Sequence, residues 1–237
     1  MSECGEDGMY LIAGGANRYN ETFKDFWKLK IDKSENGKLI AGKMKIGEFD
    51  NWFARTGHCS VSTSNGDVYI FGGQHYTHQR HNNEFFYFKA NNDNLIKIDD
   101  AKGDIPPKRN SHAMAYHKDS NSIYLFGGAD EEGPKNDFFR FKIDEKNWEK
   151  LEVPEGVKAL EMHTMEAWGI NKILIIGGRS SEGVSKEIYK FDVKQNKWDL
   201  GFKKLPVPLC AHSSLMIGDN LYVVGGLAEQ LLSDFIF

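Results

Sequence analysis

The amino-acid sequence contains five Gly-Gly doublets at nearly regular intervals. Their first glycines are Gly14, Gly72, Gly127, Gly177 and Gly225, which are 58, 55, 50 and 48 residues apart. A short apolar run precedes each doublet, as in Ile123-Tyr124-Leu125-Phe126. A regular period of this length is typical of proteins that stack copies of one supersecondary unit. The sequence therefore predicts five copies of a single structural repeat.

Each repeat carries the signals of antiparallel strands. The apolar run before the doublet predicts a buried strand, and turn residues such as Asn65-Gly66 precede it. Before the turn lies a strand-length segment that starts at a histidine: His58, His112, His163 or His212. After the doublet, a loop leads to an acidic residue and an alternating aromatic segment, which predicts a third strand with one buried face. Trp148 and Trp198 then begin a fourth strand, so we expect a hairpin-connected sheet in each repeat.

The order of these signals resembles the kelch repeat of β-propellers. The series is Arg-x-x-His, Tyr-x-Phe-Gly-Gly, an acidic residue with an aromatic neighbour, and Trp, and the best matches run over 109–148 and 172–198. The resemblance covers essentially the whole chain and implies an all-β fold, a kelch-like β-propeller of four-stranded antiparallel blades. Propellers of this family usually have six or seven blades. Five visible repeats therefore imply either part of a six- or seven-bladed ring or an unusual five-bladed one.

We expect residues 1–237 to form a single kelch-like propeller. The predicted repeat units span 9–56, 57–110, 111–161, 162–210 and 211–237. The first unit begins at the turn Asp7-Gly8, so we expect it to lack an innermost strand, and the last ends at Asp234-Phe235-Ile236-Phe237, so we expect it to lack an outer one. The first and last blades are predicted to be incomplete.

Charge and composition exclude several classes of function. The 30 Lys and Arg against 34 Asp and Glu give a net charge of −4, which argues against binding to nucleic acid. No apolar run approaches the roughly 20 residues that span a bilayer, and the N-terminus has no apolar segment typical of a signal peptide. Cys4, Cys59 and Cys210 stand alone in the sequence, which suits a reducing compartment. We therefore expect a cytoplasmic protein that binds neither nucleic acid nor membrane.

The loops after the doublets and those before the next histidine are predicted to share one face of a propeller. This face combines charged, aromatic and arginine side chains, as protein-recognition surfaces do. The predicted partner-binding residues are Arg18, Trp52, Arg55, His75, Tyr76, Arg80, Arg109, Asp130 and Arg179. For Arg55 and Arg109 two roles stay open. They could bind the carboxylates of an acidic peptide through bidentate hydrogen bonds, or they could link loops within the fold.

The sequence offers little evidence of catalysis. His75, His78 and His81 form the one metal-like series, but this spacing does not force three imidazoles to converge, and a solvated loop is expected instead. Because the histidines at the start of the inner strands recur in four repeats, we interpret them as buried hydrogen-bonding groups. Some kelch-like propellers are enzymes, including copper radical oxidases, yet no nucleophile with a base and no matching Cys and Tyr set is found. We expect no catalytic residue, metal or cofactor.

These observations predict a non-enzymatic protein–protein interaction module, an adaptor or scaffold that binds a partner through the loop face. One alternative is a structural subunit of a large intracellular assembly, docked through open blade edges. Another is a metal- or sugar-dependent kelch-type enzyme, which the three-histidine loop motivates.

Overall fold

A computed structural model describes residues 1–5, 9–17, 19, 21–33, 39–75 and 80–228. Within these residues all regular elements are β-strands, and no helix there is long and apolar enough to cross a membrane. The chain divides into two compact units, an N-terminal unit of Met1–Asp100 and a C-terminal unit of Ala101–Phe237. Each unit is described by itself.

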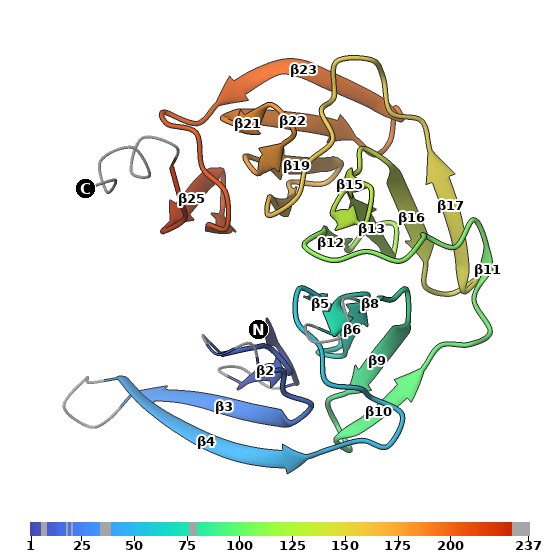
Figure 1. Cartoon of the computed structure of the whole chain (residues 1–237), viewed down its shortest axis with the longest axis vertical. Helices are drawn as coiled ribbons and strands as arrows, with labels where there is room; N and C mark the ends of the chain where they lie inside the picture. The colour runs from blue at the N-terminus through green and yellow to red at the C-terminus, as the bar shows by residue number, and fades with distance from the viewer. Residues whose placement is uncertain (6–8, 18, 20, 34–38, 76–79, 229–237) are drawn as a thin grey trace. The chain divides into compact units, whose positions relative to one another are not determined.

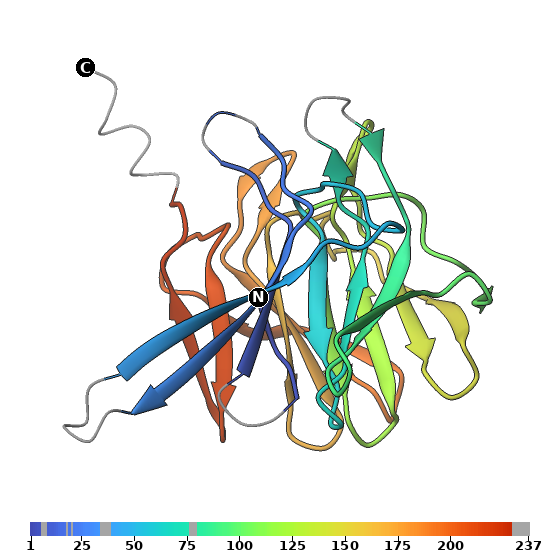
Figure 2. The same cartoon turned by 90° about the horizontal axis from the view of Figure 1, so that it is seen from below.

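The N-terminal unit contains two four-stranded antiparallel sheets, which we call blades one and two (Figure 1). Blade one has the spatial order β1 (Ser2–Glu3), β2 (Met9–Ala13), β3 (Phe26–Lys33) and β4 (Leu39–Gly47). Blade two has the order β5 (Cys59–Ser62), β6 (Val68–Phe71), β9 (Phe85–Lys89) and β10 (Asn94–Lys97), with the small hairpin β7 (Gln74–His75) and β8 (Arg80–His81) between its second and third strands. Strands β3 and β4 extend beyond β1 and β2 as a two-stranded ribbon (Figure 2).

The C-terminal unit repeats this pattern. Blade three consists of β12 (Ala113–His117), β13 (Ser122–Phe126), β16 (Phe138–Lys142) and β17 (Asn147–Leu151), and β11 (Lys102–Gly103) pairs in parallel with β17. Blade four consists of β18 (Thr164–Trp168), β19 (Lys172–Ile176), β22 (Glu187–Asp192) and β23 (Lys197–Lys204). Small hairpins follow the doublets: β14 (Ala129–Asp130) with β15 (Gly133–Pro134), and β20 (Arg179–Ser180) with β21 (Gly183–Val184). The hairpin β24 (Ser213–Ile217) and β25 (Asn220–Val224) begins the fifth repeat.

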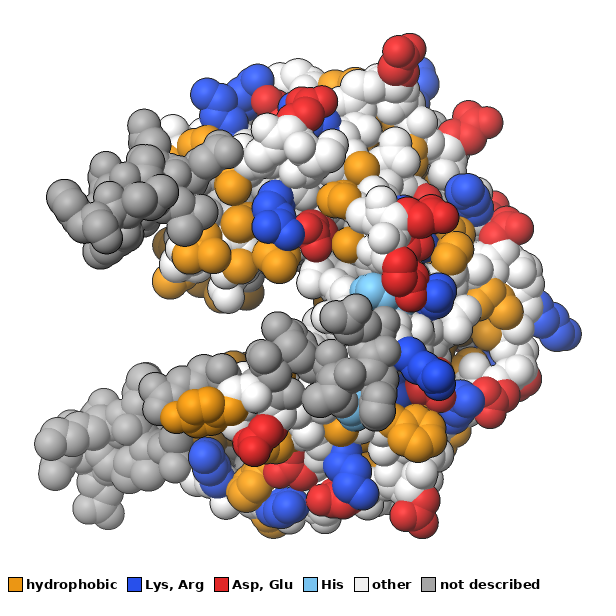
Figure 3. Space-filling model, in the orientation of Figure 1, with side chains coloured by type: hydrophobic (Ala, Val, Ile, Leu, Met, Phe, Trp, Pro, Cys, Tyr) orange, Lys and Arg blue, Asp and Glu red, His pale blue; other side chains and the backbone are white. Residues whose placement is uncertain are grey.

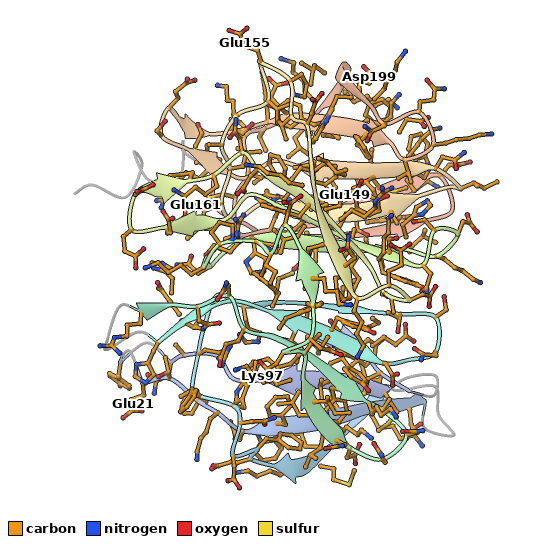
Figure 4. The ribbon with its side chains drawn as sticks, turned by 90° about the vertical axis from the view of Figure 1, so that its right-hand side faces the viewer. Glu21, Lys97, Glu149, Glu155, Glu161 and Asp199 are labelled. Atoms are coloured by element: carbon orange, nitrogen blue, oxygen red, sulfur yellow. The ribbon has the colours of Figure 1, made fainter. Side chains whose placement is uncertain are left out.

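The four-stranded antiparallel blades confirm the predicted fold class. Trp148 lies in β17 and Trp198 in β23, the outer strands that they were predicted to begin. In Figure 4, Glu149 and Asp199 mark the same two strands, where they form ion pairs with the neighbouring strands through Arg140 and Lys190. The repeat boundaries stay a prediction, and the proposed end of the last blade at 234–237 lies outside the described residues.

Two features differ from expectation. The two-residue strand β1 occupies the inner edge of blade one, where the sequence predicted no strand, because Ser2 and Glu3 pair with Leu11 and Tyr10. The third strand β16 has the predicted buried face, formed by Phe139 and Phe141, while Arg140 and Lys142 on the other face are partly exposed. What the sequence did not predict is that Phe138, which points to the other face, is also buried, at 0% exposed. Phe191 and Trp198 of blade four cover it.

The doublets at Gly14, Gly127 and Gly177 form joints between consecutive repeats of the same unit. All ten doublet glycines have positive φ, a conformation that costs residues with a Cβ about 1–2 kcal/mol. The first glycine also faces the next repeat closely: a Cβ on Gly14 would lie 2.8 Å from the carbonyl oxygen of Arg55, and one on Gly177 would lie 2.5 Å from that of Leu209. The second glycine, such as Gly178, donates its backbone N–H to the same carbonyl at 2.8 Å. Glycine therefore lets two backbones meet directly.

A histidine of the following repeat completes each of these joints. His58, His163 and His212 follow the accepting carbonyl by three residues, and the Cε1 atom of His212 would lie 2.8 Å from a Cβ on Gly177. Burial lowers the pKa of His58 and of His163 to about 3 in each case. It also lowers the pKa of His212, whose Nε2 lies 3.0 Å from the Thr164 hydroxyl. His163 and His212 are buried, at 5% and 6% exposed, as the sequence predicted, and His212 has a hydrogen bond; His58 is only partly buried by exposed surface.

Candidate functional site

Arg55 organises the loop end of blade two. Its guanidinium is 1% exposed and lies 4.0 Å from the centre of the Trp52 ring. It donates hydrogen bonds to the Phe53 carbonyl at 3.1 Å, to the Gly72 carbonyl at 3.2 Å, to Asn82 Oδ1 at 3.0 Å and to Glu84 Oε2 at 2.5 Å. Burial lowers the pKa of Arg55, while Glu84 acts to raise it. This one side chain thus connects three loop segments.

A pocket of about 470 Å³ opens above this arginine. Its lining residues are Phe53, Ala54, Arg55, His75, Arg80, His81, Asn82 and Glu84. His75 and Arg80 face each other across the hairpin β7–β8. Asn82 supports the base, since its amide donates to the Gly73 carbonyl at 3.0 Å and its oxygen accepts from the Glu84 N–H at 3.2 Å. The pocket therefore has a hydrogen-bonded floor and an aromatic rim.

The rim is formed by Phe53, an aromatic residue with 65% of its surface exposed. Its neighbour Trp52 is 2% exposed and makes edge contacts with Phe26 and Phe86 at 5.2 Å each. An exposed aromatic beside a pocket is typical of a protein-recognition site. We call this pocket, with Phe53 and Arg80 at its edge, the blade-two pocket.

Arg109 holds the corresponding position in blade three and also donates four side-chain hydrogen bonds. It is 1% exposed and binds Asp137 through two hydrogen bonds of 2.6 and 2.8 Å. It also donates to the carbonyls of Gly127 at 2.8 Å and Pro107 at 3.0 Å. Of the two roles left open for Arg55 and Arg109, linking loops is the one that these contacts support.

The remaining predicted binding residues are placed as follows. Asp130 lies in β14, where partial burial would raise its pKa but hydrogen bonds from Lys135 and the Glu132 amide lower it. Arg179 lies in β20 and contacts Glu161 Oε1 at 2.6 Å, so its pKa is raised; Figure 4 marks Glu161. Both residues belong to hairpins equivalent to β7–β8. Their charges are engaged within the chain.

Of the predicted set, His75, Arg80 and Arg55 come together in the blade-two pocket, and Trp52 lies beneath it in the core. Arg109, Asp130 and Arg179 occupy equivalent loop ends of blades three and four. Arg18 and Tyr76 lie outside the described residues, as does His78 of the three-histidine series. Among the residues that the structure describes, no group of three or more His, Cys, Asp or Glu side chains could hold a metal ion.

Phe53 and Asn82 are site residues that the sequence analysis did not identify. Phe53 had a detectable signal, because successive side chains of an extended segment point to opposite sides. A Trp-Phe pair before a buried arginine should therefore place one ring inward and the other outward. Asn82 had no such signal, since its contacts with Gly73 and Arg55 form only in the folded loop.

Four-stranded antiparallel blades joined through glycine doublets and buried histidines define a kelch-type β-propeller protein. A family model described as the KLHDC2/KLHL20/DRC7 Kelch-repeats domain matches residues 57–237. The chain belongs to the kelch-repeat family. No individual curated protein matches it significantly. Kelch-repeat domains are generally protein-interaction modules and are typically non-enzymatic.

Proposed function

We propose that this protein is a non-enzymatic adaptor or scaffold that binds a segment of a partner protein in the blade-two pocket. The observation that carries the proposal is Phe53, 65% exposed at the rim of a pocket of about 470 Å³. Aromatic and arginine side chains dominate the binding energy of protein interfaces. Phe53 and the exposed Arg80 supply both at one place.

The geometry of the pocket suits an apolar side chain of the partner. Arg55 at the base already hydrogen-bonds Glu84, so it adds shape and rigidity more than a free charge. The Glu84 carboxylate also lies 3.4 Å from the Lys97 ammonium. A rigid base lowers the entropy lost on binding. Arg80 would then favour acidic residues beside the anchoring side chain, because charges at an interface rim steer association.

We further propose that the protein acts in the cytoplasm. Its three cysteines are free thiols in the structure, and Cys4 and Cys210 are buried. Burial raises the pKa of both thiols, which disfavours the reactive thiolate.

Peptide-library selection on the purified protein tests the binding site. We expect enriched peptides to lose about 30-fold in affinity for Phe53→Ala, which corresponds to the roughly 2 kcal/mol of a binding hot spot. Arg80→Ala should weaken them less, and more strongly at low salt. Phe23→Ala is the matched control, because Phe23 is also an exposed phenylalanine, at 41%, in the same unit. Equal binding by wild type and Phe53→Ala would refute the site.

A second candidate function is a subunit of a larger assembly. It is favoured by a separate observation, the exposed apolar face of the hairpin β24–β25, where Val224 is 70% exposed.

A further inference from the structure

The two ends of blade three carry different chemistry. Figure 3 shows acidic and basic side chains intermixed over the C-terminal unit on the side where Figure 1 labels β15 and β21, and there the Lys135 ammonium lies 2.9 Å from the carboxylates of Asp130 and of Glu132. The opposite end of blade three is the turn between β12 and β13, which follows the register pair His117 and Ser122. At this turn an imidazole meets a serine hydroxyl.

His117 and Ser120 form a hydrogen-bonded pair at this turn. The Ser120 hydroxyl oxygen lies 2.8 Å from His117 Nδ1, and His117 Nε2 lies 2.6 Å from the carbonyl oxygen of Ile170 in blade four. The backbone N–H of Ser120 also donates to Nδ1, at 3.2 Å. These contacts assign the tautomer: Nδ1 accepts, and Nε2 carries the proton that the Ile170 carbonyl accepts. In this tautomer Nδ1 can take the proton of the Ser120 hydroxyl.

The imidazole of this pair is buried, whereas the serine is exposed. His117 is 3% exposed, and its ring makes an edge contact with Tyr124 at 6.2 Å between ring centres. Ser120 lies at the surface of the turn. The Ile170 carbonyl and the Tyr124 ring hold the imidazole in one orientation. A hydroxyl beside a base that a third group orients is the arrangement that activates serine as a nucleophile.

The fold itself does not require this pair. Five residues after the histidine that starts the inner strand, blade three has His117, whereas the other repeats with such a histidine have Thr63, Trp168 and Ile217. Each of these repeats still forms an antiparallel inner hairpin. The turn therefore forms without a contact between histidine and serine, and the pair is particular to blade three.

Ser120 lines a pocket of about 210 Å³, together with Arg140 and Lys142. These two cations lie on the same side of β16 as Phe138, which packs against Trp198 of blade four. The pocket therefore lies on the side of blade three that faces blade four, within the C-terminal unit. Its volume is below the roughly 300–1,000 Å³ of pockets that hold drug-sized ligands, so it suits a short acyl group.

We propose that Ser120 is a nucleophile that accepts an acyl group from a small ester in this pocket. Ser120 Oγ attacks the carbonyl carbon of the ester while His117 Nδ1 takes the hydroxyl proton. The new Oγ–C bond forms, the C–O bond of the ester breaks, and the departing alkoxide takes the proton from His117 and leaves as an alcohol. Arg140 and Lys142 stabilise the negative charge that develops on the carbonyl oxygen.

This acylation goes beyond the proposed function. It transfers one acyl group to each chain, and its site lies in the C-terminal unit, whereas the blade-two pocket lies in the N-terminal unit. Acetylation of the whole chain by p-nitrophenyl acetate tests it, with the rate at each serine followed by peptide mass spectrometry. Ser64 is the internal control, because it is an exposed serine in the turn between β5 and β6. We expect Ser120 to be acetylated about 100-fold faster than Ser64, a typical contribution of a general base.

The variant His117→Asn separates the role of a base from that of a turn cap. An asparagine Oδ1 in place of Nδ1 accepts the same hydrogen bonds from Ser120, but an amide does not take up a proton as an imidazole does. We expect acetylation of Ser120 to slow by about 100-fold in this variant. Urea denaturation checks that the variant is folded, and acetylation of Ser64 should keep its wild-type rate.

Two results would overturn the proposal. The first is acetylation of Ser120 in the wild type no faster than that of Ser64, a comparison that needs no variant to fold. The second is an unchanged rate at Ser120 in folded His117→Asn protein, because the imidazole would then serve only to cap the turn. Neither result bears on the blade-two pocket, since peptide binding is measured separately.

Discussion

Repeats two and three differ from repeats four and five at one position before the inner strand. In repeats two and three this position is a buried arginine, Arg55 or Arg109, and in repeats four and five it is a leucine, Leu160 or Leu209. The backbone hydrogen bond at this position is the same with either residue. The carbonyls of Arg55, Leu160 and Leu209 all accept a hydrogen bond of 2.8 Å from the N–H of the second glycine of the preceding repeat. The joint is therefore a backbone structure that tolerates either side chain.

The side chain instead decides what happens at the loop end. Arg109 pairs with Asp137, the acidic residue that precedes the third strand of its blade; the arginine is buried and the carboxylate is 18% exposed. In blade four, where leucine replaces arginine, the equivalent Glu187 pairs with Lys204 at 2.7 Å, and 58% of the Lys204 side chain is exposed. Arginine thus gives a rigid polar loop end, and leucine gives an apolar one with its charges moved to the surface.

The largest expected effect is at the buried arginine of blade three, Arg109. Arg109→Ala leaves Asp137 without its bidentate partner and should lower the free energy of unfolding by about 3–5 kcal/mol, measured by urea denaturation. Arg140→Ala is the control, because Arg140 also pairs with a carboxylate, Glu149, but at the half-exposed surface, where such pairs contribute about 1 kcal/mol or less. Equal losses in the two variants would contradict the distinction between the loop ends.

The next effect concerns pH and should be common to both kinds of repeat. His58 lies three residues after Arg55, and His163 lies three residues after Leu160. Both histidines nevertheless have a pKa of about 3 in the folded protein, against an ordinary value near 6.5 in the unfolded chain. Because the unfolded state takes up these protons first, stability should fall as the pH drops below about 6.5, by up to about 2 kcal/mol for each histidine between pH 6.5 and 5.

Denaturant titrations at a series of pH values measure this slope. His58→Gln and His163→Gln should each reduce the slope of the free energy of unfolding against pH by the contribution of one proton. This reduction is expected whatever stability each variant loses at pH 7. A slope unchanged by both variants would show that these imidazoles are not the groups that titrate on unfolding.

The smallest effect is expected at the surface pair of the leucine-type repeat. Lys204→Ala removes the partner of Glu187 and should change the free energy of unfolding by about 1 kcal/mol or less, since solvent screens exposed pairs. The same urea measurements apply. A loss as large as that of Arg109→Ala would mean that the two kinds of loop end are energetically alike.

Much of the framework could be predicted from the sequence because its determinants are local. Gly-Gly at the end of an apolar run specifies a strand that ends in positive φ, and each doublet has that conformation. The third strands were predicted in part. Alternation in Phe138-Phe139-Arg140-Phe141 indicated one buried face, which Phe139 and Phe141 form. The burial of Phe138 on the opposite face depends on Phe191 and Trp198, which are distant in sequence.

The candidate site was predictable only in part. His75 and Arg80 were identified from their loop, and the structure brings them to one pocket with Arg55. The roles of Trp52 and Phe53 could not be separated by composition, since both are large aromatic residues. Contact with Phe26 and Phe86 buries Trp52, and the ring left outside is Phe53.

The sequence by itself determined the repeat: the glycine doublets, the strand alternation and the histidine found before four of the inner strands act within a few residues, so they specify the same kind of blade along the chain. Only the tertiary structure decided which side chains are available to a partner. Arg55 meets Glu84 across 29 residues of chain, and Gly225 differs from Gly177 by what packs against it. Burial depends on the neighbours that folding brings together, and no short stretch of sequence specifies them.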